Sequence, residues 1–442
     1  MTAGCEPRSD RLLRLPLVGE LGSQLSVAVR AARQLRGGST IVWDDFGSAQ
    51  VDLFVTLLEL GYRTWLERST DGVRLYLDPD GSVPRDGGRD KTGSSTHSVA
   101  GTPDGRVLAT TTADRVVVLD ASSRTVLGYV GVGSRPEHVD VSGDGRWLFA
   151  ANSASDDVTV VDLLTTEAAA TAPVGRGPLL PSVAPRGDLA WVPSRADGRV
   201  HVVRPDGSTA ARIEVGASPH DIALSPDGRW AYQPNQGDGT VTVIDARALR
   251  AEGRVEVGTA PCHVAFGPDG ALAYVANTAS DDVSVVRTDD HEVIRTLRAG
   301  RGPHLPVATP DGRAVVVADF VSDDIVVWDA TTYECRGVVP VGRYPHGLGL
   351  SPDARTLVVS HTGAASVAIV DISGPRVVAS VDVEGAPGHV AFDPEGRCAF
   401  VACERAETVS VIDVTRGVLV GVVSVGGASD PARAEEQAAP VR

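Results

Sequence analysis

The sequence is poor in several features that mark particular classes of protein. Its 442 residues include five cysteines, one methionine and only 5% aromatic residues. The cysteines are unevenly spread and form no CxxC or CxxCH motif. This spacing excludes a zinc ribbon and a covalently attached c-type haem, and it indicates free thiols rather than a disulfide framework. No apolar run approaches the roughly 18 residues of a membrane-spanning helix, so we expect no membrane partner.

Positive charge is also scarce. The chain has 41 lysines and arginines against 57 acidic residues, a formal net charge of -16 at pH 7. Nucleic-acid binding requires a basic face, so we expect no nucleic-acid partner. The first residues show no basic segment followed by an apolar one, and we therefore expect a cytoplasmic location. The length exceeds what one hydrophobic core usually supports, which predicts several domains or a repeat.

A repeat is present. The turn motif PDG, or a close variant, ends at eight evenly spaced positions: Gly105, Gly145, Gly187, Gly228, Gly270, Gly312, Ala354 and Gly396. Around each turn, apolar residues alternate with polar ones in four short runs separated by Asn, Asp, Gly and Ser, a pattern typical of strands and turns. Eight units of about 42 residues, each with four antiparallel strands, predict an eight-bladed β-propeller over residues 95–426. The reading frame offers no strand exchange, so we expect blade 8 to pack directly on blade 1.

The repeats also resemble known propellers. YVANTASDDVSVV, FAANSASDDVTVVD and FVACERAETVSVID are similar to the repeats of the YVTN family of β-propellers, and the resemblance covers roughly residues 95–426. Eight copies also resemble the haem-d1-binding propeller of dissimilatory nitrite reductases and their biosynthetic relatives. In that family a histidine at the start of an inner strand ligates the haem iron. The resemblance implies this role for His138, in PEHVDVSGDGRWLFA.

The N-terminal region has a different pattern. Residues 12–80 predict a small α+β domain of order βαβαββ, with helices over 21–35 and 48–61 and a hairpin turning at Asp71-Gly72. VWDDFGSAQVDLFVTLLELGYRTWLE resembles the TusA-type sulfurtransferase fold. The active cysteine of that family lies at the first strand–helix junction, which here reads VGELGSQ and contains no cysteine, so we expect a degenerate docking or partner domain rather than a persulfide relay. Residues 1–11 and 427–442 are expected to be disordered, and 81–94 to form a flexible linker.

Histidines recur at one place in the repeat. Seven of the eight units carry one just before the turn, although the chain has only ten histidines: His97, His138, His220, His263, His304, His346 and His389. The innermost strand of a propeller blade lines the central channel, so we expect these imidazoles to gather at one mouth. Converging imidazoles are what copper, iron or a haem-type tetrapyrrole requires. Alternatively, each histidine donates a hydrogen bond to a carbonyl of the neighbouring blade.

The spacing divides these histidines into two sets. His97, His220, His304 and His346 lie eight positions before the last residue of the turn, and the other three lie seven before it. Strand side chains alternate between faces, so the two sets point to different sides unless the entry loops absorb the extra residue. We predict that three or four histidines meet, with the first set as the metal ligands. Cys262, next to His263, is either a further ligand or a packed thiol.

Arginines accompany the histidines. Arg135, Arg176, Arg301 and Arg343 lie in the loops before the first strands of their blades, and we predict that they bind an anion. Alternatively, they are solvated loop arginines that pair with nearby aspartates. The SDD triplets at 155–157, 280–282 and 322–324 are either calcium-binding loops or turns.

Together these features predict a propeller whose His/Arg-lined mouth binds a metal or haem-type cofactor and an anionic small molecule. The chemistry would be redox or Lewis-acid chemistry, as in a metal- or haem-dependent oxidoreductase. Two alternatives stay open. One is a non-catalytic scaffold for a protein partner. The other is a metal-independent, lactonase-like hydrolase that would use Glu137 and Asp221, the acidic residues beside histidines.

Overall fold

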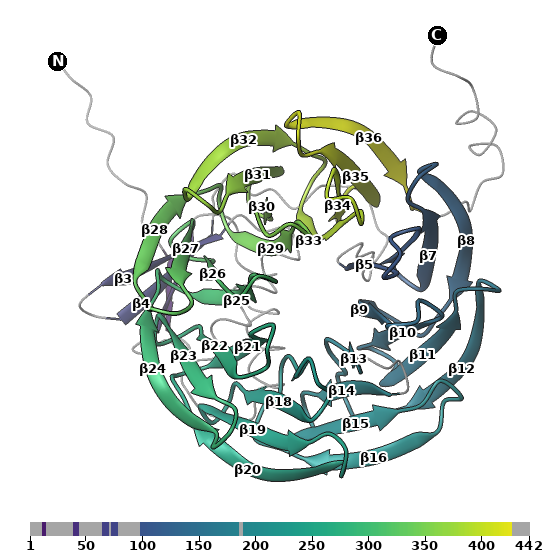
Figure 1. Cartoon of the computed structure of the whole chain (residues 1–442), viewed down its shortest axis with the longest axis horizontal. Coiled ribbons are helices and arrows are strands. Elements are labelled where there is room, and N and C mark those ends of the chain that lie inside the picture. Colours follow the sequence, from purple (N-terminus) through teal and green to yellow (C-terminus); the bar gives the residue numbers. More distant parts are fainter. Residues whose placement is uncertain are drawn as a thin grey trace. The chain divides into compact units, whose positions relative to one another are not determined.

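The computed structural model describes residues 11–14, 39–43, 64–69, 72–77, 98–184 and 189–426, and only the backbone of the first four segments. Every regular element in these residues is a β-strand (Figure 1). His97 and the two expected N-terminal helices lie outside the described residues. Within the described part of the chain, no helix has the length and apolar character needed to cross a membrane.

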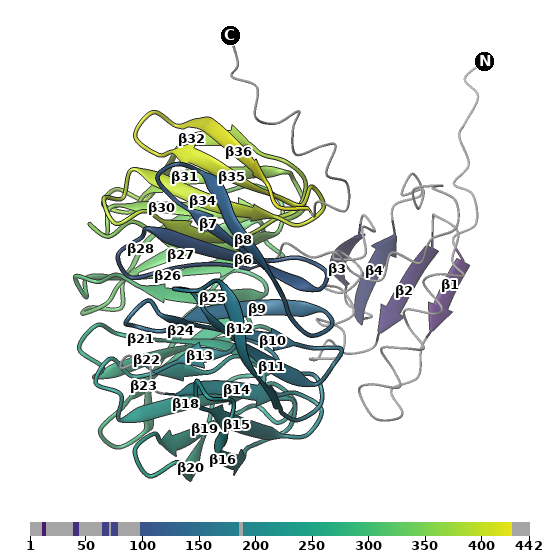
Figure 2. The same cartoon turned by 90° about the vertical axis from the view of Figure 1, so that its right-hand side faces the viewer.

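The N-terminal strands form one sheet. Its strands are β1 (Arg11–Arg14), β2 (Ser39–Trp43), β3 (Thr64–Ser69) and β4 (Gly72–Leu77). They lie in the order β1-β2-β4-β3, with β1 parallel to β2 and the other pairs antiparallel (Figure 2). β3 and β4 pair as an antiparallel hairpin, in which Ser69 pairs with Gly72, so Gly72 lies in a strand and not in the turn where it was predicted. The resemblance to TusA stays a prediction.

The remaining strands form eight four-stranded antiparallel sheets, one for each repeat, which confirms the predicted propeller fold. The chain forms two compact units. The first contains blades 4–6: β17–β20 (Ala223–Leu224, Trp230–Asn235, Thr240–Asp245, Arg250–Glu256), β21–β24 (Pro261–Phe266, Leu272–Asn277, Asp282–Arg287, Glu292–Arg298) and β25–β28 (Pro303–Ala308, Ala314–Asp319, Asp324–Asp329, Cys335–Pro340).

The second unit contains blades 1, 2, 7 and 8 and most of blade 3. Blades 1 to 3 are β5–β8 (Val99–Gly101, Val107–Thr111, Arg115–Asp120, Thr125–Gly131), β9–β12 (Pro136–Val141, Trp147–Asn152, Asp157–Asp162, Glu167–Pro173) and β13–β16 (Ser182–Val183, Ala190–Ser194, Arg199–Val203, Thr209–Glu214). Blades 7 and 8 are β29–β32 (Pro345–Leu350, Thr356–His361, Ser366–Asp371, Arg376–Asp382) and β33–β36 (Pro387–Phe392, Cys398–Cys403, Thr408–Asp413, Val418–Ser424).

The repeated turn owes its shape to two features. Its last residue has positive φ in the seven blades whose turn the structure describes, 61° at Gly105 for example, which glycine adopts without strain. Blade 7 carries Ala354 there, at φ 60°. In blades 1, 2, 4, 6 and 7 the aspartate of the motif accepts a hydrogen bond from a Ser or Thr hydroxyl two residues earlier, as Asp104 does from Thr102 at 2.6 Å. These bonds lower the pKa of the Asp104 carboxyl and close the turn.

Each blade buries its faces against its neighbours. In the first unit, separate apolar clusters join blades 4 and 5 and blades 5 and 6. In the second unit, such clusters join blades 1 and 2, 2 and 3, and 7 and 8. Because each of these apolar clusters joins two adjacent blades, a single repeat has no core of its own.

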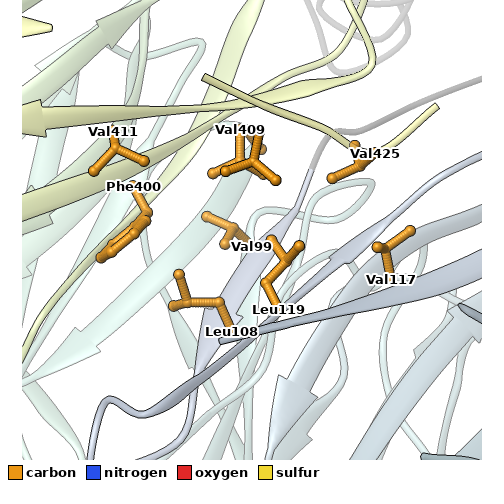
Figure 3. Close-up of a cluster of buried hydrophobic side chains, with 10 residues drawn as sticks. Val99, Leu108, Val117, Leu119, Phe400, Val409, Val411 and Val425 are labelled. Carbon is orange, nitrogen blue, oxygen red and sulfur yellow. The ribbon is translucent and has the colours of Figure 1, made fainter. Parts of the chain in front are cut away.

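Blade 8 packs directly on blade 1, as the sequence predicted. Phe400, Val409 and Val411 of blade 8 meet Val99, Leu108 and Leu119 of blade 1 (Figure 3). All four strands of each of these blades follow one another in the chain, so no strand is exchanged between them. The contact between the last and first repeats in this unit therefore includes a continuous apolar cluster.

The SDD triplets form hydrogen bonds with the loop that leads into the next blade. The carboxylates of Asp156, Asp281 and Asp323 each accept a backbone N–H from the following loop, at 2.9, 3.0 and 2.9 Å respectively. The middle residue of each triplet has positive φ, between 58° and 61°. The triplets thus form turns, as one of the two alternatives predicted, and they also tie the turn to the next loop.

The second strand of each blade ends in a polar position that is buried. In blades 2 and 5 an asparagine amide there donates to the aspartate that begins the third strand, at 2.6 Å for Asn152 to Asp157 and 2.7 Å for Asn277 to Asp282. In blade 6 the pair is Asp319 and Asp324, two carboxyl groups directly opposite each other. Burial and the charge of Asp324 raise the pKa of Asp319 to about 9, so Asp319 is protonated at neutral pH.

Candidate functional site

Three of the predicted histidines meet in the first unit. The ring centroid of His263 lies 5.1 Å from that of His220 and 4.4 Å from that of His304, and His220 lies 6.3 Å from His304. They come from three successive blades, each from the segment that begins with the proline of the first strand. We call these three residues the histidine cluster.

The cluster contains histidines of both spacing sets, so spacing alone does not separate them. The reason is a β-bulge at the start of the first strands. In β21, Pro261 pairs with Asn277 but His263 pairs with Ala276, so Cys262 is an extra residue. In β25 a similar shift lies between Pro303 and Pro306. A bulge sets two residues against one and interrupts the alternation of faces.

A thiol completes the group. One donor atom each from Cys262, His263 and His304 lie within 4.8 Å of one another. Ligand atoms around a tetrahedral zinc ion are about 3.3–3.8 Å apart, from bond lengths of about 2.0–2.3 Å. Shifts of roughly an ångström would therefore bring these donors around one ion. Cys262 is 1% exposed and its sulfur contacts the hydroxyl of Thr278 at 2.8 Å.

A carboxylate fixes the orientation of His263. Its Nδ1 lies 3.2 Å from Oδ2 of Asp221, and the two side chains are 6% and 17% exposed. A carboxylate only accepts hydrogen bonds, so this contact favours the form of His263 with its proton on Nδ1. The other ring nitrogen, Nε2, is buried and has no hydrogen-bond partner among the described residues. This arrangement leaves a lone pair on a buried nitrogen, as in histidines that bind metals.

His220 is held neutral. Burial lowers its pKa well below the usual range, and the proximity of His263 and of the Arg195 guanidinium lowers it further. Its Nδ1 is buried without a hydrogen-bond partner in the described part of the chain. Arg195 donates to the side chain of Gln236 at 3.0 Å, and the backbone of Gln236 donates to Ser218, two residues before His220. A guanidinium group is therefore anchored beside this imidazole.

The backbone that carries His220 and Asp221 is irregular. In blade 4 the first strand pairs with the second only at Ala223 and Leu224 and at an isolated bridge from Pro219 to Asn235. Between these points the second strand has Pro234, which has no N–H to donate. The Gln233 amide instead donates to the carbonyls of Asp221 and Pro234, at 2.7 and 2.8 Å. The segment is thus displaced from the sheet at the cluster.

Three other predicted histidines form a second group, in the second unit. The ring of His389 lies 5.2 Å from that of His138 and 5.8 Å from that of His346. His346, predicted as a ligand together with His220 and His304, therefore contacts a histidine of its own unit. Unlike Cys262, His263 and His304, these three are not among the described groups whose donor atoms converge closely enough to hold an ion.

The predicted arginines are exposed in their loops. Arg135 forms an ion pair with Glu137 at 2.9 Å, a glutamate rather than the aspartate of the alternative. Burial raises the pKa of the Asp323 carboxyl group. Arg301 and Arg343 both lie near this group, and their charges offset part of the increase. Arg343 also lies over the ring of Tyr344, while Arg176 is exposed in blade 3. Arg195, beside His220, was not predicted, because it follows a second strand rather than preceding a first one.

Solved structures share the fold at low sequence identity. "Kuenenia stuttgartiensis Hydrazine Synthase" aligns over 74% of this chain and 98% of its own, with 20% identity and a TM-score of 0.53. "Dihydro-heme d1 dehydrogenase NirN in complex with DHE" aligns over 74% of this chain and 72% of its own, with 15% identity and a TM-score of 0.62. A functionally unknown protein from Desulfotomaculum acetoxidans DSM 771 aligns over 61% and 92%, with 15% identity and a TM-score of 0.50.

Sequence comparison gives the family. No curated protein matches the chain. The profile described as "Lactonase, 7-bladed beta-propeller" matches residues 186–299 and 333–442, just over half of the chain. The first matched segment contains His220, Asp221, Cys262 and His263, whereas His304 lies between the two matched segments. This chain has eight four-stranded sheets in its repeats where the family description has seven blades. The chain belongs to the Lactonase, 7-bladed beta-propeller family.

Proposed function

We propose that the protein is a metal-dependent hydrolase that opens a small, anionic cyclic ester. The observation that carries this proposal is the buried convergence of Cys262, His263 and His304. Two imidazoles and a thiolate suit zinc or copper rather than magnesium or calcium, which prefer oxygen ligands. Three protein ligands with a fourth position left for water or substrate are typical of catalytic rather than structural zinc sites.

The residues around these ligands have defined tasks. Asp221 holds the Nδ1 proton of His263 and so presents Nε2 as a ligand. His220, whose ring lies 5.1 Å from that of His263, is the residue placed to take the proton of the attacking water. Arg195 binds the anionic part of the substrate, as a guanidinium group does for carboxylates. A bound metal ion would supply Lewis acidity to the ester carbonyl.

The reaction is a hydrolysis and needs no oxidant. The water oxygen forms a bond to the carbonyl carbon as His220 takes its proton. The ring C–O bond then breaks, and His220 returns the proton to the departing alkoxide oxygen. The product is an open-chain hydroxy acid. The family name supports this reaction class.

A haem-type tetrapyrrole is the second candidate, because the NirN structure named above is a complex with DHE. The residues of this chain fit it less well. His138, the ligand implied by the sequence resemblance, has its ring 5.2 Å from that of His389. A planar macrocycle at His138 would have to displace that ring. Three donors that converge on one point instead suit a single ion. An absorption spectrum after incubation with haem separates the two candidates.

Metal binding is tested first. Protein incubated with Co²⁺ is expected to bind one ion at the cluster and to show visible d–d bands with a thiolate charge-transfer band in the near ultraviolet. Cys262→Ser removes the charge-transfer band, and His304→Ala abolishes the stoichiometric binding. His389→Ala, in the second group of histidines, is the matched control and retains both signals. Wild-type protein without bound cobalt, or unchanged spectra in both cluster variants, would contradict the proposal.

Asp221→Asn tests the orientation of His263. The amide has nearly the same shape but can present N–H to the imidazole, so the ring is no longer held as the Nδ1–H tautomer. Loss of such an outer partner typically weakens metal affinity about 10–100-fold. We expect this loss in a Co²⁺ titration, and hydrolysis of γ-butyrolactone-3-carboxylate, followed by proton release, is expected to fall with it at limiting cobalt. An affinity equal to that of wild type would show that Asp221 has no role in the site.

A further inference from the structure

One buried residue departs from the pattern of the repeat. Gln233 lies third from the end of the second strand of blade 4 and is 0% exposed. The residues at this position in the other blades are all small and apolar: Ala109, Ala150, Val192, Val275, Val317, Val359 and Val401. A buried amide costs free energy unless its hydrogen bonds are met. Gln233 meets only part of its capacity, since Oε1 has no hydrogen-bond partner among the described residues.

The next residue explains what the amide does. Pro234 occupies the position that Ala276 has in blade 5, where Ala276 pairs with His263 on the neighbouring strand. Pro234 has no N–H to donate across the strands, although its carbonyl accepts the N–H of His220 at 3.3 Å, and pairing is interrupted between Pro219 and Ala223. Blade 3 has the same interruption beside Pro193, but it has no glutamine and no histidine there. Only blade 4 therefore combines the interrupted strand with a side chain that holds it.

The amide holds the residue that orients His263. Nε2 of Gln233 donates to the carbonyl of Asp221 at 2.7 Å. The backbone N–H of Asp221 donates to the carbonyl of Cys262 at 3.3 Å, so Asp221 is fixed from both sides. Its carboxylate then reaches Nδ1 of His263. The displaced segment thus has one defined position, set by Gln233 in place of the missing ladder bond.

We propose that Gln233 is a positioning residue of the metal site, which acts through Asp221 to hold His263 in the Nδ1–H tautomer. The inference rests on the metal-dependent function proposed above. It adds that blade 4 gives up regular strand pairing to build the site. Giving blade 4 the sequence pattern of the other blades is therefore expected to restore strand pairing and to weaken metal binding.

The test is the double variant Gln233→Val with Pro234→Ala, which changes WAYQPN to WAYVAN, the pattern of blade 5. We expect its Co²⁺ affinity to fall about 10–100-fold, while its unfolding temperature stays the same or rises. Pro193→Ala in blade 3 is the matched control, because it restores an N–H beside no histidine, and it leaves the affinity unchanged. A purely structural role for Gln233 predicts the opposite, a lower unfolding temperature with unchanged affinity.

A second measurement does not depend on metal. The ¹⁵N chemical shifts of the His263 ring in metal-free protein report its tautomer. We expect the Nδ1–H form in wild type and a mixture of tautomers in the double variant. Gln233→Asn, one methylene shorter, keeps the amide but no longer reaches Asp221, and it is expected to give the same mixture. A pure Nδ1–H form in both variants would overturn the inference. Failure of wild type to bind cobalt, with the tautomer shift present, would instead count only against the proposed function.

Discussion

Replacing Asp319 by asparagine is expected to raise the free energy of unfolding at pH 7 by about 2–4 kcal/mol. Asp319 and Asp324 face each other where blades 2 and 5 pair asparagine with aspartate. An asparagine keeps the acceptor for the Gly300 N–H, now at 3.0 Å, and donates its amide to Asp324. The substitution therefore removes the opposition of two buried carboxyl groups without leaving a cavity.

The pH dependence of the free energy of unfolding shows why removing the Asp319 carboxyl group stabilises the protein. The pKa of Asp319 is raised to about 9 in the folded protein, against an ordinary value of 3.8. Between these pH values the folded protein retains a proton that the unfolded chain has lost. Stability is therefore full below about pH 4 and is lost as the pH rises towards 9, at up to about 1.4 kcal/mol per pH unit.

Urea unfolding at pH 5, 7 and 9 checks this expectation. At pH 5, Asp319→Asn should raise the free energy of unfolding only slightly. At pH 9 the increase should be largest. The reciprocal variant Asn277→Asp introduces the same carboxyl pair into blade 5 and should acquire the pH-dependent loss that Asp319→Asn removes. Equal slopes against pH in wild type and both variants would show that the Asp319 carboxyl ionises as it does in the unfolded chain.

Phe400→Ala is expected to cost about 3–5 kcal/mol, the usual range for a buried phenylalanine. Phe400 is 3% exposed and lies in the cluster that joins blade 8 to blade 1 (Figure 3). Since no strand is exchanged there, the cluster has no shared sheet to support it when its largest side chain is removed.

The matched control is Val422→Ala, on the outer strand of the same blade, where the side chain is 42% exposed. It should change the urea midpoint only slightly. A similar small change for both variants would mean that the contact between blades 8 and 1 contributes little to the stability of the second unit.

Much of this molecule could be predicted from the repeat. The turn ending at Gly270 and its equivalents marked every blade, and the recurrence of histidine identified the residues of the cluster. The grouping of His263 with His220 and His304 was less accessible. It depends on the bulge at Cys262, and a bulge has no fixed sequence pattern.

Residues that act from a second strand were missed for another reason. Gln233 is separated from the histidine of blade 4 by a turn, and Arg195 belongs to blade 3, which has no histidine at that position. Only the folded protein brings both residues beside the segment that carries His220. One signal was nevertheless present in the sequence. When the eight repeats are aligned, Gln233 is the one large polar residue in a column of alanine and valine. The same alignment exposes Asp319 in a column where blades 2, 4 and 5 carry asparagine.

The consecutive strands of each blade have a consequence for how the chain can be rearranged. Since β5–β8 and β33–β36 each complete a sheet without borrowing a strand, a covalent link between successive blades carries no pairing of its own. A circular permutant whose new ends fall between blades 1 and 2 would therefore rebuild the same sheets and the same Phe400 contact. In this propeller each sequence repeat begins and ends where one four-stranded sheet does. We therefore expect that a whole blade can be exchanged for another as a unit.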